Sequence, residues 1–281
     1  MRFSGAVADS DDLIATIIGA PFDGTATYRA GTRFGPRAIR EASESLESYS
    51  PFLDYSLEDF AFTDRGDLEL PPGSASRAIQ IIADAVREAL DHNLKTMILG
   101  GEHTITLGAV EAMKEHYPDL YVLQLDAHTD LRSEYLGEKL SHATIMRRVI
   151  ELVGEENIVR FGVRAGTKEE MEESGIALPL GLEGGQRDME LLMQNLSPDR
   201  PLYVTIDLDV FDPSLIPGIG NPEPMGITYR EFIQVARLLS RLKVVGADVV
   251  ELAPPYDPSG VSAVIAASVV RELLLVMALS S

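Results

Sequence analysis

The sequence contains no cysteine and no tryptophan, and aromatic residues make up only 6% of it. Without cysteine, the chain forms no disulfide bond and offers no thiolate ligand to a metal ion. Any bound metal must therefore be held by oxygen atoms and imidazole nitrogens. The lack of cysteine does not by itself decide the cellular compartment.

Basic residues are scarce as well. The chain has 24 lysines and arginines against 44 aspartates and glutamates, which gives a formal net charge of −20. Such an excess of negative charge repels nucleic acid and anionic membranes and weakly attracts cations. We therefore expect no nucleic-acid partner and no membrane partner. The same charge is also typical of a surface adapted for solubility or salt, so charge alone identifies no ligand.

Long apolar segments are also missing. The longest apolar run, Val261 to Val270, is followed by Arg271 and Glu272 well short of the roughly 20 residues that a bilayer requires. We predict that this run is a helix buried in the core. The start, Met1 to Asp12, lacks the basic flank and continuous apolar stretch of a secretory signal. The cytoplasm is therefore the expected location.

Short, β-rich apolar runs alternate with amphipathic segments along all 281 residues. The predicted strands are Leu13–Ile18, Thr96–Leu99, Leu120–Leu125, Ile158–Phe161, Leu202–Ile206 and Val244–Val250. The predicted helices are Pro36–Ser48, Ala75–His92, Leu107–His116, Ala143–Leu152, Met189–Leu196, Thr228–Leu242 and Val261–Leu279. The alternation predicts an α/β fold: a single three-layer α/β/α domain, residues 1–281, with a mostly parallel central sheet. Ligands of such sheets bind beyond the carboxyl ends of the strands.

Local signals support these boundaries. Pro36 suits the first turn of a helix, and Thr228 followed by Glu231 fits a capping box. No linker, repeat or low-complexity tract divides the chain. The segment Asp212–Gly226 is interpreted as a loop of the functional site. Two other glycine-bearing segments, Pro21–Gly35 and Gly181–Gly185, are interpreted as turns.

Acidic and histidine side chains directly follow three of the predicted strands. Strand 120–125 runs into Asp126, His128 and Asp130. Alternate residues of an extended segment share a face, so these three side chains should point into one cavity. The other two strands supply the remaining candidates, which are Asp207 and Asp209 after 202–206 and His103 after 96–99.

A lone acid or histidine at a strand end is more often a helix cap, but six that converge are a different case. Four bare carboxylates at one sheet edge would repel one another and shift one another's pKa values, so a cation must neutralise them. One metal ion rarely uses so many protein ligands when water and substrate must also bind, so two ions with shared carboxylates fit better. Oxygen and imidazole ligands favour Mn²⁺, with Fe, Co, Ni or Zn also compatible.

These residues belong to longer motifs, which are Gly100-Gly101-Glu102-His103, Asp126-Ala127-His128-Thr129-Asp130 and Ile206-Asp207-Leu208-Asp209-Val210-Phe211-Asp212-Pro213. In this order they resemble the signature set of the ureohydrolase family, which includes arginase and agmatinase. The likeness extends to Pro21-Phe22-Asp23-Gly24-Thr25, Gly31-Thr32-Arg33-Phe34-Gly35-Pro36 and the segment from Asp248 to Asp257, so it covers nearly the whole chain. It implies an arginase-like fold.

The resemblance also implies two Mn²⁺ ions per chain. One ion would be held by His103, Asp126, Asp130 and Asp207, and the other by His128, Asp126, Asp207 and Asp209. Asp126 and Asp207 would then bridge the ions. Water between two such ions would ionise near neutral pH and attack the guanidino carbon, with release of an amine and urea.

Three residues acquire catalytic roles from the same resemblance. Asp130 would hydrogen-bond the attacking water and pass its proton on. His142, in Ser141-His142-Ala143, would be the proton shuttle, and the alternative is an exposed histidine at a helix start. Glu251 would grip the guanidinium by charge-assisted hydrogen bonds, and the alternative is a surface or capping acid. His92 and His116 lie near predicted helix ends and are expected to be structural.

Residues 131–141 lack the asparagine and serine pattern with which arginases hold an α-amino acid head, and they look more like agmatinase. The expected substrate is thus a small cationic guanidino compound, with agmatine converted to putrescine and urea. Guanidinobutyrate, guanidinopropionate, arginine, guanidine and formimidoylglutamate stay open as rival substrates. Glu134 or Glu138 could attract the distal ammonium group, or both could be solvated loop acids. In the loop 218–226, Asn221 and Met225 replace the threonine and glycine usual in agmatinases.

Two functions from other classes account for only part of the sequence. A nucleotide-binding module, with Gly100-Gly101 cradling phosphate, is disfavoured because no G-x-G-x-x-G or P-loop follows the first strand and the carboxylates would repel phosphate. A catalytically silent metal-binding regulatory subunit would not need His142 and Glu251. Members of the family form trimers or hexamers, so a homotrimer or homohexamer is expected.

Overall fold

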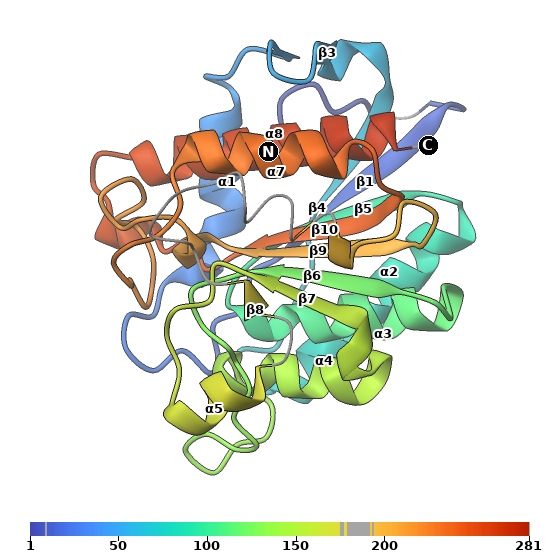
Figure 1. Cartoon of the computed structure of the whole chain (residues 1–281). Helices are drawn as coiled ribbons and strands as arrows, with labels where there is room; N and C mark the ends of the chain where they lie inside the picture. The colour runs from blue at the N-terminus through green and yellow to red at the C-terminus, as the bar shows by residue number, and fades with distance from the viewer. Residues whose placement is uncertain (9, 175–176, 179–191, 193, 281) are drawn as a thin grey trace.

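An eight-stranded sheet forms the centre of the molecule (Figure 1), in the order β4-β1-β5-β10-β9-β6-β7-β8. The computed structural model describes the chain except for residues 9, 175–176, 179–191, 193 and 281. The strands are β1 (Leu13–Ala20), β4 (Ala61–Asp67), β5 (Lys95–Gly100), β6 (Tyr121–Leu125), β7 (Ile158–Phe161), β8 (Ala177–Leu178), β9 (Leu202–Asp207) and β10 (Val244–Val250). Each neighbouring pair in this sheet is parallel, and a separate antiparallel pair joins β2 (Tyr49–Ser50) to β3 (Tyr55–Ser56).

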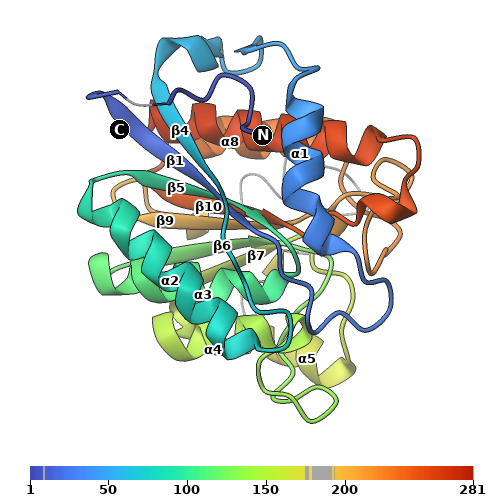
Figure 2. The same cartoon turned by 180° about the vertical axis from the view of Figure 1, so that it is seen from behind.

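Helices cover both faces of the sheet (Figures 1 and 2). One face carries α1 (Gly35–Ser43), α7 (Tyr229–Leu239) and α8 (Val261–Leu279), and the other carries α2 (Ala75–Asp91), α3 (Thr106–His116) and α4 (Ile145–Val153). The short α5 spans Lys168–Glu173. Single 3-10 turns lie at Thr32–Phe34, Leu57–Asp59, His103–Ile105, His142–Thr144, Glu155–Asn157, Leu208–Val210 and Pro254–Tyr256. A separate apolar core fills each interface, so the predicted three-layer α/β/α architecture is confirmed.

The strand order explains why the candidate residues converge. The strand β6 follows β5 in sequence but is not its neighbour in the sheet. The later strands β10 and β9 lie between them. The four strands β5, β10, β9 and β6 are thus neighbours, and their carboxyl ends lie at one edge. Candidate residues that are far apart in sequence follow these four ends.

The helix α8 is the one described segment long and apolar enough to cross a membrane by length and composition. Its most apolar window is 72% buried inside the structure, where it packs between α1, α7 and the sheet. Arg271 and Glu272 form an ion pair in this helix, and Glu272 also accepts the Ser50 hydroxyl at 2.7 Å. The prediction of a buried core helix is confirmed.

The capping signals were correct, whereas several element boundaries were not. Thr228 and Glu231 form the predicted capping box, and Pro36 lies in the first turn of α1. However, α1 ends at Ser43 rather than at Ser48, because serine hydroxyls there bond to carbonyls of the preceding turn and compete with the helix. Similarly, α7 ends at Leu239, and the predicted start of α4 is a 3-10 turn.

The sequence patterns missed two strands of the large sheet. The segment of β4 is polar because it lies at the sheet edge, where Asp64 pairs with the buried Arg40 of α1 at 2.8 Å. The strand β8 at the other edge contains only two residues. The turn Gly181–Gly185 and half of the predicted helix Met189–Leu196 fall outside the described residues, and the described positions Leu192, Gln194 and Asn195 are helical.

Candidate metal centre and active-site cavity

The six predicted metal ligands do converge, but not on a continued extended strand. The strand β6 ends at Leu125, and Asp130 has a left-handed backbone with φ of 52°. Asp209 lies in a 3-10 turn, held because its backbone N–H donates to Asp207 Oδ1 at 2.8 Å. The predicted convergence was therefore right and its geometric reason was wrong, since tight turns direct these side chains.

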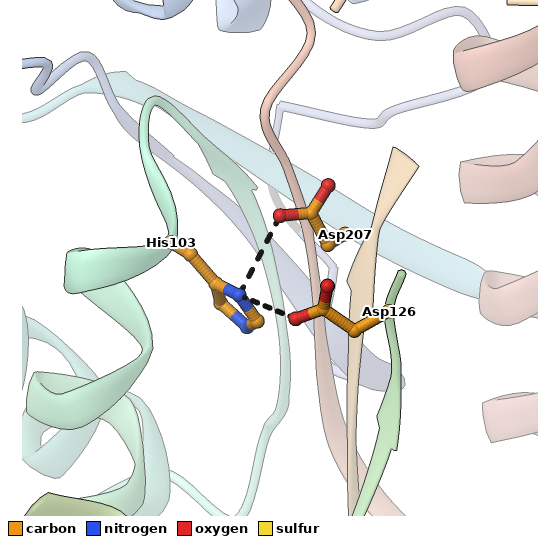
Figure 3. A group of neighbouring side chains, drawn as sticks. All are labelled: His103, Asp126 and Asp207. Atoms are coloured by element: carbon orange, nitrogen blue, oxygen red, sulfur yellow. Dashed lines mark ion pairs between the residues drawn. The ribbon is translucent and has the colours of Figure 1, made fainter. Parts of the chain in front are cut away.

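One group of possible ligands surrounds His103 (Figure 3). The ring nitrogen Nδ1 lies 3.1 Å from Asp126 Oδ2, 3.1 Å from Asp130 Oδ2 and 3.6 Å from Asp207 Oδ2. The ring and the Asp126 side chain are fully buried, and the other two carboxylates are nearly so. Despite these neighbours, Nδ1 makes no hydrogen bond within the described residues. An imidazole nitrogen among three carboxylate oxygens has the chemistry of a divalent cation site.

A second group shares Asp126 with the first. It consists of Asp126, His128 and Asp209, whose possible ligand atoms all lie within 4.8 Å of one another. The nitrogen Nδ1 of His128 lies 2.8 Å from Asp209 Oδ2 and 3.8 Å from Asp126 Oδ1. Asp207 belongs by distance to the first group, so its role as a second bridge stays a prediction. The two groups together form a candidate binuclear metal site.

The electrostatics of the cluster show why it needs cations. Burial, together with nearby Asp209 and Asp130, raises the pKa of Asp126 to about 7, although His103 opposes the rise. Burial and the same kind of repulsion raise the pKa of Asp207 well above its usual range. Unit charges about 4 Å apart repel by about 4 kcal/mol at an effective dielectric constant of about 20. Without metal the cluster therefore retains protons, and divalent ions would replace them.

In the second group, burial and neighbouring charges have opposite effects on the pKa values of His128 and Asp209. Burial opposes the charged form of His128, but Asp209 and Asp126 outweigh it and raise the pKa of His128 to about 10. Burial also opposes the charge of Asp209, yet His128 and the backbone N–H of Ala127 hold its pKa at about 2. This shared proton offsets negative charge that a cation held by His128 and Asp209 would otherwise offset.

Sequence reasoning missed the groups that hold the His103 ring. Its other nitrogen, Nε2, lies 2.8 Å from the hydroxyl of Thr205, which donates to Asp248 Oδ1 at 2.6 Å. Asp248 also accepts the hydroxyls of Tyr203 at 2.8 Å and Thr106 at 2.9 Å, and all of these side chains are fully buried. The one Thr205 proton is committed to Asp248, so Nε2 must carry a hydrogen, and the neutral ring then has its lone pair on Nδ1, where a cation among the carboxylates can bind it. A threonine within a strand gives no local signal of this role.

All of the candidate metal ligands except Asp126 line a cavity of about 170 Å³. His142 and Glu251 also line it, so the structure places these two predicted catalytic residues, like Asp130, beside the candidate ligands. Three further lining residues, Arg132, Tyr135 and Glu170, form what we call the rim of the cavity. Arg132 lies over the Tyr135 ring, 4.6 Å from its centroid, and 3.5 Å from Glu170 Oε1.

Glu251 is held in an uncommon conformation. Its backbone is left-handed, with φ of 67°, and its N–H donates to Gly101 O at 2.8 Å. Its Oε1 accepts the backbone N–H of His103 at 2.7 Å, whereas Oε2 makes no hydrogen bond within the described residues. Non-glycine residues in this region cost about 1–3 kcal/mol and cluster at functional sites. The surface-acid alternative does not fit, because Glu251 is only 8% exposed.

The remaining predicted histidines lie where the sequence placed them. His92 caps the carboxyl end of α2 and His116 is the last residue of α3. Neither lines the cavity. The loop acids Glu134 and Glu138 are exposed and line a neighbouring cavity of about 760 Å³ rather than the metal cavity.

Comparisons with known proteins agree with the fold and identify the family. A model of the Arginase family matches residues 14–276. The chain is 46% identical to an agmatinase of Bacillus cereus over 264 residues, which cover 92% of this chain and 90% of that protein. It is 39% identical to an N(1)-aminopropylagmatine ureohydrolase of Thermococcus kodakarensis, covering 88% of this chain and 86% of that protein.

Among solved structures, the agmatine ureohydrolase of Thermoplasma volcanium superposes with a TM-score of 0.88 at 30% identity, covering 99% of this chain and 94% of that chain. The family match spans nearly the whole chain and includes each strand end that supplies a candidate ligand. The chain therefore belongs to the Arginase family and is a ureohydrolase enzyme.

Proposed function

We propose that the protein hydrolyses agmatine to putrescine and urea with two Mn²⁺ ions per chain. One observation carries the proposal: the two metal-capable groups share Asp126, and their other members line the cavity that also holds His142 and Glu251. The relatives named agmatinase support agmatine as the substrate. We further propose a cytoplasmic, single-domain protein that assembles as a homotrimer or homohexamer.

The residues present fit two divalent cations. The buried Nδ1 of His103 faces three carboxylates and lacks a hydrogen-bond partner among the described residues. The ligand set contains only oxygen and nitrogen atoms, which suits Mn²⁺. The proposed ligands are His103, Asp126, Asp130 and Asp207 for one ion, and His128, Asp126, Asp207 and Asp209 for the other. When bound, the ions would lower the pKa of water and make hydroxide available near neutral pH.

The proton balance defines what the protein side chains must do. In the reaction, the oxygen of water ends in urea and both protons of water end on the leaving amine, which departs as an ammonium ion. The cavity must therefore move two protons to the leaving nitrogen. Asp130 and His142 both line the cavity and supply the acid and base groups for this transfer. Burial lowers the pKa of His142, which keeps its ring neutral and able to accept a proton.

Glu251 is suited to hold the guanidinium group. Oε1 is fixed by the His103 backbone, so the carboxylate has a defined orientation and offers Oε2 to a cationic substrate. Burial, with nearby Glu102, raises the pKa of Glu251 well above its usual range. A bound guanidinium would offset that cost by a charge-assisted hydrogen bond.

The test is release of urea and putrescine by purified, Mn²⁺-loaded protein. We expect agmatine to give the highest kcat/KM in a panel with guanidinobutyrate, guanidinopropionate, arginine, guanidine and formimidoylglutamate. Metal analysis should find about two Mn²⁺ per chain. Absence of urea release from every guanidino compound, with both ions bound, would refute the proposal. A parallel series with Ni²⁺ tests the choice of metal.

A longer guanidino amine is the second candidate substrate. The neighbouring cavity of about 760 Å³ shares Thr27 and Tyr135 with the catalytic cavity, and Glu134 and Glu138 line it. The Thermococcus kodakarensis relative is named for an aminopropyl derivative of agmatine. An extended amine would place its additional ammonium groups near these acids. Adding N(1)-aminopropylagmatine to the panel separates the two candidates by their kcat/KM ratio.

A further inference from the structure

His142 is not a proposed metal ligand, so other groups must set the direction of its ring. Both hydrogen-bond contacts of this residue go to one atom, the hydroxyl oxygen of Thr25. The ring nitrogen Nδ1 lies 3.3 Å from this oxygen, and the backbone N–H of His142 donates to it at 3.2 Å. The Thr25 hydroxyl in turn lies 2.5 Å from Oε1 of Glu102.

Glu102 is a fully buried carboxylate that the proposed reaction does not use. Its Oε1 accepts hydroxyl protons from Thr25 and, at 2.6 Å, from Thr104, and its Oε2 accepts the backbone N–H of Thr25 at 2.8 Å. It forms no ion pair within the part of the chain that the structure describes. An ionised carboxylate accepts these three hydrogen bonds at once, so the geometry fits the charged form of Glu102.

The count of protons then determines the state of His142. A threonine hydroxyl has one proton, and Thr25 gives it to Glu102. The Thr25 oxygen can therefore only accept from the histidine, so the hydrogen of the neutral ring lies on Nδ1. The other nitrogen, Nε2, is left with its lone pair and makes no hydrogen bond within the described residues. An acid–base histidine needs this defined tautomer.

The same arrangement occurs at His103, which provides an independent comparison. There a buried carboxylate, Asp248, takes the proton of Thr205, and the histidine donates to the threonine oxygen. The nitrogen that carries the hydrogen is Nε2 at His103 and Nδ1 at His142, and in each case the opposite nitrogen is left for the cavity. The two supports come from different strands and loops, so the repeated order of groups is a property of the site.

We propose that Glu102 and Thr25 are positioning residues that hold His142 in the Nδ1–H tautomer, with Nε2 presented to the catalytic cavity as the atom that takes and gives the proton. The proton-transfer role of His142 rests on the proposed function, whereas the tautomer does not. The assignment concerns a carboxylate that touches neither the substrate cavity nor the reacting atoms.

The decisive variants change the proton count without changing the shape of the side chain. Thr25→Val removes both the donor and the acceptor, and Thr25→Ser restores them. Glu102→Gln presents an amide N–H to Thr25, which frees the Thr25 proton for Nδ1 and should reverse the tautomer of His142. We expect Thr25→Val and Glu102→Gln to lower kcat for agmatine about 10- to 100-fold, with KM changed less than about 3-fold, and Thr25→Ser to recover most of the loss.

The tautomer is measured directly from imidazole ¹⁵N shifts and couplings in histidine-labelled protein loaded with diamagnetic Zn²⁺. Wild type should show hydrogen on Nδ1 of His142, and Glu102→Gln should show it on Nε2. The matched control is Ser50→Ala, which removes a hydroxyl from another fully buried glutamate, Glu272, remote from the cavity. This control should lower stability and leave both kcat and the His142 spectrum unchanged.

Two results would overturn the positioning role: hydrogen on Nε2 in the wild type, or unchanged kcat in Thr25→Val protein with both metals bound. A wild type that fails to hydrolyse agmatine would instead contradict the proposed function, because the ¹⁵N spectrum still decides the tautomer. Loss of metal from the variants, measured by metal analysis, would show a merely structural effect and would also count against the positioning role.

Discussion

The metal ligands and the rim of the cavity are built in different ways. The six ligand side chains come from the ends of three strands, β5, β6 and β9, and five of the six are at most 11% exposed. The rim side chain of Arg132 is 42% exposed and is held by one long ion pair with Glu170 and by the Tyr135 ring. Buried groups fixed by several contacts can keep distances within tenths of an ångström, whereas an exposed rim can change with little loss of stability. We infer that the metal ligands set the chemistry and the rim sets substrate preference.

The largest effect should follow from removing the residue that both metal groups share. Asp126→Asn should abolish binding of the ions and reduce urea release at least about 10³-fold, since metal is what lowers the pKa of water from 15.7 to about 7. Metal analysis and urea release measure the two losses. If the variant kept two ions per chain, the shared-ligand arrangement would be wrong.

The same variant tests the electrostatics of the metal-free ligand cluster. The pKa of Asp126 is raised by burial to about 7 in the folded chain, against about 3.9 when unfolded. A raised acid pKa means that the folded state binds the extra proton, so the stability of wild type falls as pH rises from about 4 to about 7. Asp126→Asn lacks this loss. Its free energy of unfolding, measured by urea denaturation, should therefore increase relative to that of wild type between about pH 4 and pH 7 and then keep a constant difference. A difference that stays constant across that window would contradict the shift.

The next effect concerns proton transfer and not the metals. His142→Ala should keep both ions while lowering kcat about 10²- to 10⁴-fold, the usual contribution of a general acid or base. The measurement is steady-state kinetics beside metal content. The control is His116→Ala, because His116 lies at the exposed end of α3 away from the cavity. Unchanged turnover in His142→Ala would remove the shuttle role.

A smaller effect should come from the support behind the metal ligands. Thr205→Val removes the acceptor that orients His103 and should weaken metal affinity about 10- to 100-fold, as measured by titration with Mn²⁺. The matched control is Thr96→Val, since the Thr96 hydroxyl is equally buried but makes no hydrogen bond within the described residues. Equal affinities in the two variants would mean that Thr205 only fills space.

The smallest effect should be found at the rim. Arg132→Gln removes a cation that repels the ammonium of agmatine and attracts the carboxylate of guanidinobutyrate. The ratio of kcat/KM for agmatine over guanidinobutyrate should rise about 2- to 5-fold, which matches the 0.5–1 kcal/mol typical of partly exposed pairs. A large change in kcat for both substrates would show that the rim also takes part in the chemistry.

Sequence patterns predicted the layers and most strands because buried parallel strands are short apolar runs and amphipathic helices have their own period. They missed β4, whose polar residues are satisfied by a buried ion pair with Arg40, and the two-residue β8. The ligand residues were found through their position after strands and through resemblance to a family. The extended geometry expected for Asp126 to Asp130 was wrong, since a left-handed Asp130 is decided by the surrounding loops.

By itself, the sequence determined the ligand chemistry of this protein: without cysteine, acids and histidines at strand ends must provide any metal site. Only the tertiary structure decided which groups support those residues. Thr25 and Glu102 are 77 positions apart, and Thr205 and Asp248 are 43 apart, so no local pattern links them. The physical reason is that a hydrogen bond between buried side chains depends on which strands and loops pack together, and that depends on the whole chain.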